Sequence, residues 1–340
     1  MTAAGPYDAI LVLSFGGPEG PEDVVPFLEQ VTRGRNIPRE RLVEVGAHYD
    51  LFGGVSPINA ANRALIAALE AELSTAGPDL PVYWGNRNWH PFLADTLRRM
   101  AGDGVRRAVC FVTSAYSSYS SCRQYLDDIE TARAEVGARA PVVDKLRPFF
   151  DHPGFIEPMT ENVTVALAGL PAPLRTGAPL VFSAHSIPSV QAALCDYEAQ
   201  LREASRLVAG RVGAGHSWAV VYQSRSGPPS QPWLEPDVRD HLSALAADGA
   251  RAAVLVPIGF VTDHVEVIYD LDIQAAATAA DLGIEVVRAA TVGTAPAFVA
   301  MIRELIAERT EDGPRRALST LPPRPLSCAT GCCPARPPSS

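Results

Sequence analysis

The sequence predicts an α/β protein with two doubly wound halves, each built on a four-stranded parallel sheet flanked by helices. Three observations support this prediction. Eight short runs of apolar and β-branched residues occur along the chain, and segments with helical periodicity lie between them. The runs are continuously apolar rather than alternating, which is typical of strands buried on both faces of a parallel sheet.

The expected elements follow one another in the order that such a fold needs. In the first half we expect strands over residues 9–15, 81–85, 107–113 and 141–146, with helices over residues 59–73 and 92–101. In the second half we expect strands over residues 179–186, 218–224, 251–260 and 284–289, with helices over residues 197–212 and 295–309. We therefore expect a first domain at residues 1–150 and a second at residues 151–310, whose last helix packs back on the first. Residues 311–340 are rich in Pro, Arg and Ser and are expected to form an extended C-terminal tail.

Composition excludes several classes of protein. The net charge of −9 argues against a nucleic-acid partner, because phosphate binding needs clustered Lys and Arg. No apolar run approaches the roughly 20 residues of a transmembrane helix, and the longest, residues 252–261, is interrupted by Pro257 and Gly259. The first residues lack the features of a signal peptide, so we expect a cytoplasmic protein with reduced cysteines. Lys145 is the only lysine, and the lysine-containing phosphate loop of nucleotide-binding proteins is absent.

Candidate chemistry lies where two expected strands end, since ligands bind at the carboxyl ends of parallel strands. His185 ends one strand, and an acidic segment follows another, with Asp263, His264, Glu266, Asp270 and Asp272. On a helix, Glu266 and Asp270 share a face, Gln274 lies one turn further on, and Asp263 is expected to cap the helix. This combination suits a divalent metal or proton transfer. The alternative on these residues alone is a hydrogen-bonded structural histidine beside an ordinary acidic helix start.

A third segment suggests the kind of ligand. Residues 113–128 follow an expected strand and are rich in serine, with Tyr116, Tyr119 and Tyr125. The G-x-S-x-G motif of many serine hydrolases is absent here. Aromatic and hydroxyl groups at a binding site suit a large, flat organic ligand with polar edges.

Six motifs in order give the chain a family resemblance. They are "ILVLSFGGPEGPEDV", "FGGVSPIN", "GNRNWHPF", "SAHSIP", "QSRSGPPSQPWLEP" and "GFVTDHVEVIYDLD", and they extend over nearly the whole sequence. With them the chain resembles the ferrochelatases, which insert ferrous iron into a porphyrin. The resemblance implies two Rossmann-like, chelatase-type domains with the porphyrin between them.

The resemblance also implies the site residues. His185 takes pyrrole protons or guides the metal, with Glu266 as its partner, and both are expected to contact the substrate Fe²⁺. Asp270 continues the acidic series, whereas Gln274 stands where relatives often have a carboxylate, which argues against an outer metal site. The expected porphyrin contacts are Ser56, Tyr49, Arg33, Tyr125 and Phe15. Phe15 replaces a tyrosine that can ligate product iron in some relatives, so ligation from that side is not expected.

Three of the six cysteines, Cys328, Cys332 and Cys333, lie close together in the tail. The resemblance implies that they bind a 2Fe-2S cluster together with Cys122, and four thiolates are the usual number for such a cluster. The alternative is a tail that binds zinc or no metal. Cys110 and Cys195 are expected to be packing residues.

The resemblance is strongest to enzymes of GC-rich Gram-positive bacteria. It implies coproporphyrin III as substrate and hand-off of the iron product to a coproheme decarboxylase. Three alternatives remain at this point: a protoporphyrin IX ferrochelatase, a cobalt chelatase, and a non-catalytic haem or iron–sulfur sensor on the same fold.

Overall fold

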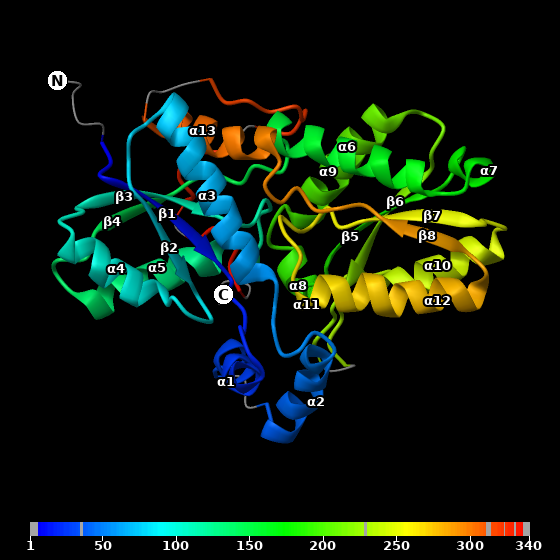
Figure 1. The fold of residues 1–340 in the computed structure, drawn as a ribbon, viewed down its shortest axis with the longest axis horizontal. Coiled ribbons are helices and arrows are strands. Elements are labelled where there is room, and N and C mark those ends of the chain that lie inside the picture. Colours follow the sequence, from blue (N-terminus) through cyan, green and yellow to red (C-terminus); the bar gives the residue numbers. More distant parts are fainter. Residues whose placement is uncertain are drawn as a thin grey trace.

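The computed structural model describes residues 6–34, 37–227, 230–310, 314–322, 324–329 and 331–335. It contains two four-stranded parallel sheets with helices on both sides, which confirms the predicted fold class (Figure 1). The first sheet consists of β1 (Ala9–Ser14), β2 (Val82–Asn86), β3 (Arg107–Val112) and β4 (Val142–Lys145). The second consists of β5 (Leu180–His185), β6 (Trp218–Gln223), β7 (Ala252–Val256) and β8 (Glu285–Arg288).

Helices connect these strands. In the first half they are α1 (Pro21–Val31), α2 (Arg39–Asp50), α3 (Ile58–Ala76), α4 (Leu93–Gly102), the π-helix η1 (Tyr119–Arg123) and α5 (Gln124–Val136). In the second half they are α6 (Pro153–Gly169), α7 (Ala172–Arg175), α8 (Ser189–Ala192), α9 (Tyr197–Val212), α10 (Val238–Ala247), α11 (Val265–Ile268), the π-helix η2 (Tyr269–Ala275), α12 (Ala276–Leu282) and α13 (Pro296–Thr310). The α1–α2 pair projects from the body at the bottom of Figure 1.

Both sheets have the same topology. The strand orders are β2-β1-β3-β4 and β6-β5-β7-β8. In such an order the connections reverse direction beside the first strand, which gives switch points between β1 and β3 and between β5 and β7. Ligands of open parallel sheets bind at these points, beyond the carboxyl ends of the strands. The strand expected over residues 251–260 ends early, at Val256, because Pro257 has no N–H to donate to a neighbouring strand.

Side chains that alternate along each strand face opposite sides of the sheet. In β1, Leu11 packs with Cys110 against α4 and α5, which confirms Cys110 as a packing residue. Ile10 and Val12 face the other way, toward Leu69 of α3. The second sheet is covered in the same manner, with α10 and α12 on one side and α6 and α9 on the other (Figure 1).

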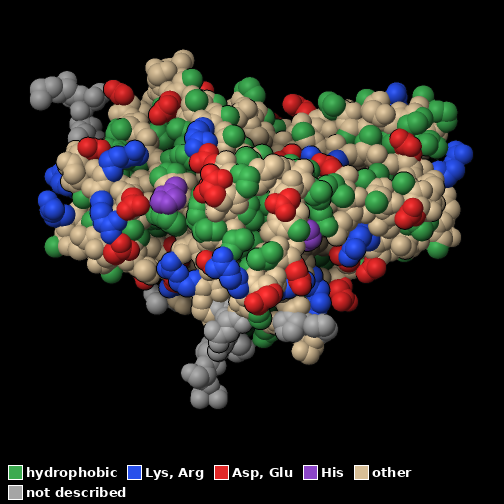
Figure 2. All heavy atoms as spheres, turned by 60° about the horizontal axis from the view of Figure 1, so that its bottom comes forward, with side chains coloured by type: hydrophobic (Ala, Val, Ile, Leu, Met, Phe, Trp, Pro, Cys, Tyr) green, Lys and Arg blue, Asp and Glu red, His purple; other side chains and the backbone are tan. Residues whose placement is uncertain are grey.

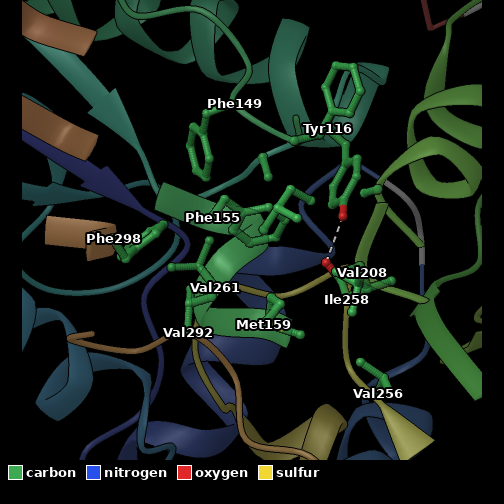
Figure 3. Close-up of a cluster of buried hydrophobic side chains, with 14 of the residues drawn as sticks. Tyr116, Phe149, Phe155, Met159, Val208, Val256, Ile258, Val261, Val292 and Phe298 are labelled. Carbon is green, nitrogen blue, oxygen red and sulfur yellow. Dashed lines mark hydrogen bonds between the residues drawn. The ribbon is translucent and has the colours of Figure 1, made fainter. Parts of the chain in front are cut away.

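One hydrophobic core extends through both halves. Its buried residues run from Tyr7 to Ile306 and come from both sheets. Helix α13, the last of the chain, packs against α3 and α6. Within this core the rings of Phe149, Phe155 and Phe298 pack together, as Figure 3 shows. The division at residue 150 therefore runs through a continuous core, and the domain boundaries stay a prediction.

The surface carries mixed charges. On the face shown in Figure 2, basic and acidic side chains are interspersed among hydrophobic and polar groups. In the part of the chain that the structure describes, no helix is both long enough and apolar enough to cross a membrane.

The C-terminal tail lies along the body. The backbone N–H of Leu318 donates to Asp151 at 2.9 Å, and Ser319 donates its hydroxyl to the Asp151 side chain at 2.6 Å. Further along the tail, Arg324 forms an ion pair with Asp196, at 2.6 Å between Nη2 and Oδ2.

A buried ion pair fixes the point where the tail begins. Arg147 donates from Nε and Nη2 to the two carboxylate oxygens of Glu308, at 2.6 and 2.8 Å, and each side chain is only 3% exposed. Removing one partner of such a pair leaves an uncompensated buried charge.

We expect Glu308→Ala to lower the free energy of unfolding by about 3–5 kcal/mol, since it leaves the Arg147 guanidinium buried without its carboxylate. Urea denaturation measures this change. The control is Glu44→Ala, which breaks the exposed Arg41–Glu44 pair and should cost less than about 1 kcal/mol. Equal effects of the two substitutions would contradict the assigned role of the buried pair.

Candidate active site

His185 and Glu266 meet at the switch point of the second sheet. His185 ends β5, and Glu266 lies in the first turn of α11, after β7. Their Nε2 and Oε2 atoms are 3.7 Å apart, and the side chains are 36% and 52% exposed. A ligand at the sheet edge can therefore reach both groups.

The protonation of His185 follows from its other nitrogen. Nδ1 lies 2.5 Å from the carbonyl oxygen of Ser186, which can only accept a hydrogen bond. Nδ1 must therefore carry the proton in the neutral ring, and Nε2 then has a free lone pair. That lone pair is on the nitrogen nearest Glu266, which places a proton acceptor next to a carboxylate.

Asp270 is the third polar group of the site. Its Oδ2 accepts a hydrogen bond from Ser224 at 2.5 Å and another from Gln223 Nε2 at 3.4 Å. Burial, reinforced by the charge of Glu266 and opposed by the Ser224 hydrogen bond, raises the pKa of Asp270 to about 6. Ser224 has a φ of 59°, a left-handed conformation that is uncommon for a residue other than glycine. Backbone strain of this kind concentrates at functional sites.

The helix that carries these carboxylates is not the regular α-helix that the sequence predicts. After the four residues of α11, the chain continues as the π-helix η2. Val265, Val267 and Leu271 are buried, whereas Ile268 is partly exposed. The expectation of one regular α-helix is therefore wrong from Tyr269 onward, where the turn widens.

Asp263 does not cap the helix as expected. His264 occupies the N-cap position, without a side-chain hydrogen bond. Asp263 instead accepts two hydrogen bonds of 3.0 Å from Arg288, which also donates to Asp272 at 2.6 Å. Arg288 therefore joins the segment before α11 to the π-helix.

Helix α2, which belongs to the first half of the chain, lies against α11 and η2. Tyr49 of α2 is buried and packs near Val265. Burial, together with the charge of Glu266, raises the pKa of Tyr49. One residue earlier, the His48 ring stacks on Tyr269 with centroids 4.0 Å apart. The structure thus brings Tyr49 into the neighbourhood of Glu266.

The remaining expected porphyrin contacts lie near β1 and α1. Phe15 follows β1, is 36% exposed, and has the Arg87 guanidinium 5.7 Å from its ring centroid. Arg87 also lies over the Tyr125 ring at 4.9 Å, and Tyr125 itself is buried in the first-sheet core.

Ser56 is buried, and its backbone N–H donates to the carbonyl oxygen of Pro18 at 2.8 Å. Arg33 is exposed in the turn after α1 and bonds to Gln30.

Three residues near the site were not predicted from the sequence. They are Gln223 and Ser224, which donate hydrogen bonds to Asp270, and the cation Arg87. Gln223 and Ser224 end the expected strand over residues 218–224, so the rule for carboxyl ends could have selected them. Arg87 follows β2 in the same way, and it forms an ion pair with Asp128 at 3.0 Å.

The tail places Cys328 beside Cys122, two of the four cysteines of the expected metal site. Cys122 is buried in η1, and its thiol shares a hydrogen bond with that of Cys328. That hydrogen bond lowers the pKa of Cys328. Burial, followed by the charges of Cys122 and Cys332, raises the pKa of Cys333 to about 12. All of these cysteines are free thiols.

The donor chemistry of this group fits an iron–sulfur cluster, because four thiolates are what such clusters require. The described structure does not bring these donors together into one metal-binding group. Among the residues that the structure describes, no three His, Cys, Asp or Glu side chains form a group that could hold a metal ion. This applies to the His185–Glu266 pair as well as to the tail.

The sequence is similar to known proteins over nearly its whole length. The family model described as Ferrochelatase matches residues 7–310. The chain is 54% identical to the coproporphyrin III ferrochelatase of Streptomyces coelicolor, over 98% of this chain and 95% of that protein. It is 53% identical to a protein of Rhodopirellula baltica named ferrochelatase, over 99% and 97% of the two chains.

The fold also resembles a solved chelatase structure. The structure of SirB from Bacillus subtilis with Fe3+ matches with a TM-score of 0.56 at 12% identity, over 88% of this chain and 96% of that one. At this identity the likeness shows the shared fold alone.

We expect Asp270→Asn to raise stability in a pH-dependent manner. The folded-state pKa of about 6 exceeds the ordinary value of 3.8, so the folded protein binds the proton more tightly than the unfolded chain. Wild-type stability therefore falls, relative to a neutral side chain, as pH rises from about 4 to 6. The Asn variant should be more stable by about 1–2 kcal/mol at pH 7.5 and no different below pH 4.

Urea denaturation at several pH values measures this difference. Asp281→Asn, at an exposed position of α12, is the control and should show no such gain. A gain for Asp270→Asn that is independent of pH would contradict the explanation.

Proposed function

The chain belongs to the ferrochelatase family, and we propose that the porphyrin into which it inserts ferrous iron is coproporphyrin III. The observation that carries the chemistry is the His185–Glu266 pair at the switch point of the second sheet. The support for the substrate is the high identity, over nearly the full length, to a protein named coproporphyrin III ferrochelatase.

Metal insertion releases two protons, because two pyrrole N–H groups lose them as Fe²⁺ binds the four nitrogens. In our mechanism the Nε2 lone pair of His185 accepts the first proton, and Glu266 stabilises the resulting imidazolium at 3.7 Å. The second proton passes to the Glu266–Asp270 pair. A carboxyl with a pKa of about 6 suits this task, since it can accept a proton and release it to water near neutral pH.

In this mechanism His185 and Glu266 also bind the metal for a short time before it enters the porphyrin. Two protein ligands leave most of the coordination sphere of Fe²⁺ open to water and then to porphyrin nitrogens. An imidazole and a carboxylate bind divalent iron without the tight hold of a complete ligand set. Transfer to the macrocycle is therefore favoured.

We propose that the porphyrin ring rests against Phe15, with Ser56 and Tyr49 beside it. Phe15 has no donor atom and does not ligate the iron. Arg33 is exposed and suited to pair with a propionate at the edge of the ring. Tyr125 lies beneath Arg87, so we assign its contribution to holding that guanidinium in place.

We further propose a 2Fe-2S cluster on Cys122, Cys328, Cys332 and Cys333. Support comes from the interaction of the Cys122 and Cys328 thiols, which shifts the pKa of each, and from the free thiols of all four cysteines. Bound there, a cluster would cross-link the tail to η1. Zinc is the alternative occupant.

The same thiols support a cytoplasmic location, since cysteines stay reduced there. The iron product would then pass to a coproheme decarboxylase in that compartment. This step follows from the chemistry of the proposed product, in which propionates must be decarboxylated to give haem.

Protoporphyrin IX is the second candidate substrate. The observation in its favour is the 53% identity to a Rhodopirellula baltica protein whose name specifies no porphyrin. A non-catalytic sensor is disfavoured, because porphyrin binding alone does not require a proton acceptor paired with a carboxylate.

Anaerobic insertion of Fe²⁺ into coproporphyrin III and into protoporphyrin IX, side by side, tests the substrate. We expect faster turnover of coproporphyrin III. A preference for protoporphyrin IX would replace the proposed substrate, and no insertion into either would favour the sensor. In the same assay, His185→Ala should lower kcat by about 100-fold or more while porphyrin still binds, as expected for loss of a proton acceptor. Turnover that survives this substitution would contradict the role of His185.

The visible spectrum and the acid-labile sulfide content of anaerobically purified protein test the cluster. Cys332→Ser should abolish both signals, because it removes one of four thiolates. Cys195→Ser is the matched control and should retain them. Zinc without sulfide in the wild-type protein would replace the cluster by a zinc site.

A further inference from the structure

The C-terminal tail has a second role, which we infer from its contacts behind His185. We propose that Tyr197 is a positioning residue for His185, and that the tail holds Tyr197 in place through the Arg324–Asp196 ion pair. This inference rests on the catalytic role proposed above for His185.

Tyr197 contacts the main chain of His185 directly. Its hydroxyl donates to the His185 carbonyl oxygen at 3.0 Å. The side chain is buried at the start of α9, with its ring edge-on to Tyr116 at 6.1 Å. Burial raises the pKa of Tyr197, so the phenol keeps its proton and remains a donor. The hydrogen bond therefore fixes the main chain at the end of β5.

The tail contacts α9, the helix that begins with Tyr197, at two points. Asp196, the residue directly before it, pairs with Arg324 at 2.6 Å. About two turns further along α9, Glu203 accepts a hydrogen bond from the N–H of Thr320 at 3.4 Å. The Arg324 side chain is 21% exposed and the Asp196 side chain 56%, so water screens the Asp196 end of this pair. Two separate points of the tail thus hold one helix.

The first half of the protein holds the same helix from another side. Gln200, one turn after Tyr197, accepts from the Ser117 N–H at 2.8 Å and donates to the Ser117 hydroxyl at 3.0 Å. Ser117 precedes the π-helix η1, which carries Cys122. The tail and the segment before η1 therefore both hold α9, the helix that contacts the main chain of His185.

The proposed chemistry depends on the position of His185, because each ring nitrogen must stay close to its partner. Nδ1 lies 2.5 Å from the Ser186 oxygen, and Nε2 lies 3.7 Å from Glu266. Displacements of about 1 Å at a catalytic group can cost up to 100-fold in rate. A tail that is released from α9 would loosen the His185 carbonyl and, with it, the ring.

Three variants test the proposal. Tyr197→Phe removes only the hydroxyl and keeps the ring in the core. Arg324→Ala cuts the link of the tail to Asp196 without touching a cysteine, and Arg324→Lys restores the charge. Arg316→Ala is the matched control, because it breaks another 2.6 Å ion pair of the tail, to Glu304 on α13.

We expect kcat for iron insertion to fall about 5-fold in Tyr197→Phe, the usual effect of one lost hydrogen bond. It should fall about 3-fold in Arg324→Ala, recover in Arg324→Lys, and stay within 2-fold of wild type in Arg316→Ala, since the Arg316 partner Glu304 lies on α13 and not beside Tyr197. The porphyrin Kd, from fluorescence quenching, should be unchanged in all four. Amide hydrogen exchange in residues 183–187 should accelerate in Tyr197→Phe and Arg324→Ala only.

Two results would overturn the proposal. One is normal kcat and normal exchange in both Tyr197→Phe and Arg324→Ala. The other is an equal loss in Arg316→Ala, which would indicate a general loosening of the tail. If the wild-type protein inserts no iron, the proposed function fails, whereas the exchange measurement still decides whether the tail holds the His185 segment.

Discussion

One buried hydrogen bond sets the geometry on which the site depends. The hydroxyl of Tyr116, after β3, donates to the carbonyl oxygen of Ile258, after β7, at 2.8 Å (Figure 3). It therefore joins the switch points of the two sheets, which are the places where parallel sheets bind ligands. Buried aromatic side chains surround it, among them Phe150, Phe155 and Tyr197. Together with the continuous core around it, this hydrogen bond holds the two ligand-binding edges in a fixed relation.

The sequence predicts some parts of this arrangement and not others. All eight strands were predictable, because a buried parallel strand reads as a continuous apolar run. The positions of His185 and Glu266 at strand ends followed from the same pattern. The π-helix was not predictable, since the spacing from Glu266 to Asp270 fits an α-helix equally well. Nor was the Arg288–Asp263 pairing, because it depends on β8 lying beside β7 and not on local sequence.

The tail shows the same division between local pattern and tertiary contact. Its composition predicts an extended segment, and the four cysteines stand out in the sequence. Which helix the tail touches is decided by partners far away, such as Asp151 for Leu318 and Asp196 for Arg324. No periodicity carries that information, so the link from the tail to α9 emerges only from the folded structure.

The site combines several features that are unfavourable by themselves. Ser224 has a left-handed backbone, and Asp270 is a carboxyl whose charged form burial disfavours. The buried Oε1 of Gln223 has no hydrogen-bond partner among the residues that the structure describes. A continuous core shared by both halves supplies the stability that offsets these local costs. This arrangement suits a group that must gain and lose protons, because a carboxyl fully satisfied by hydrogen bonds and cations would keep its charge and would not exchange protons near neutral pH.

The same reasoning applies to the metal. A protein that hands iron to a porphyrin must not compete with four pyrrole nitrogens for it. Over the described ranges of the chain, His185 and Glu266 do not belong to any group of three side chains that could hold an ion. Phe15 offers no oxygen to the finished product from the side of the first sheet. In the proposed mechanism one imidazole, one carboxylate and a phenylalanine without a donor atom give the iron few protein ligands, so the porphyrin nitrogens can take it over.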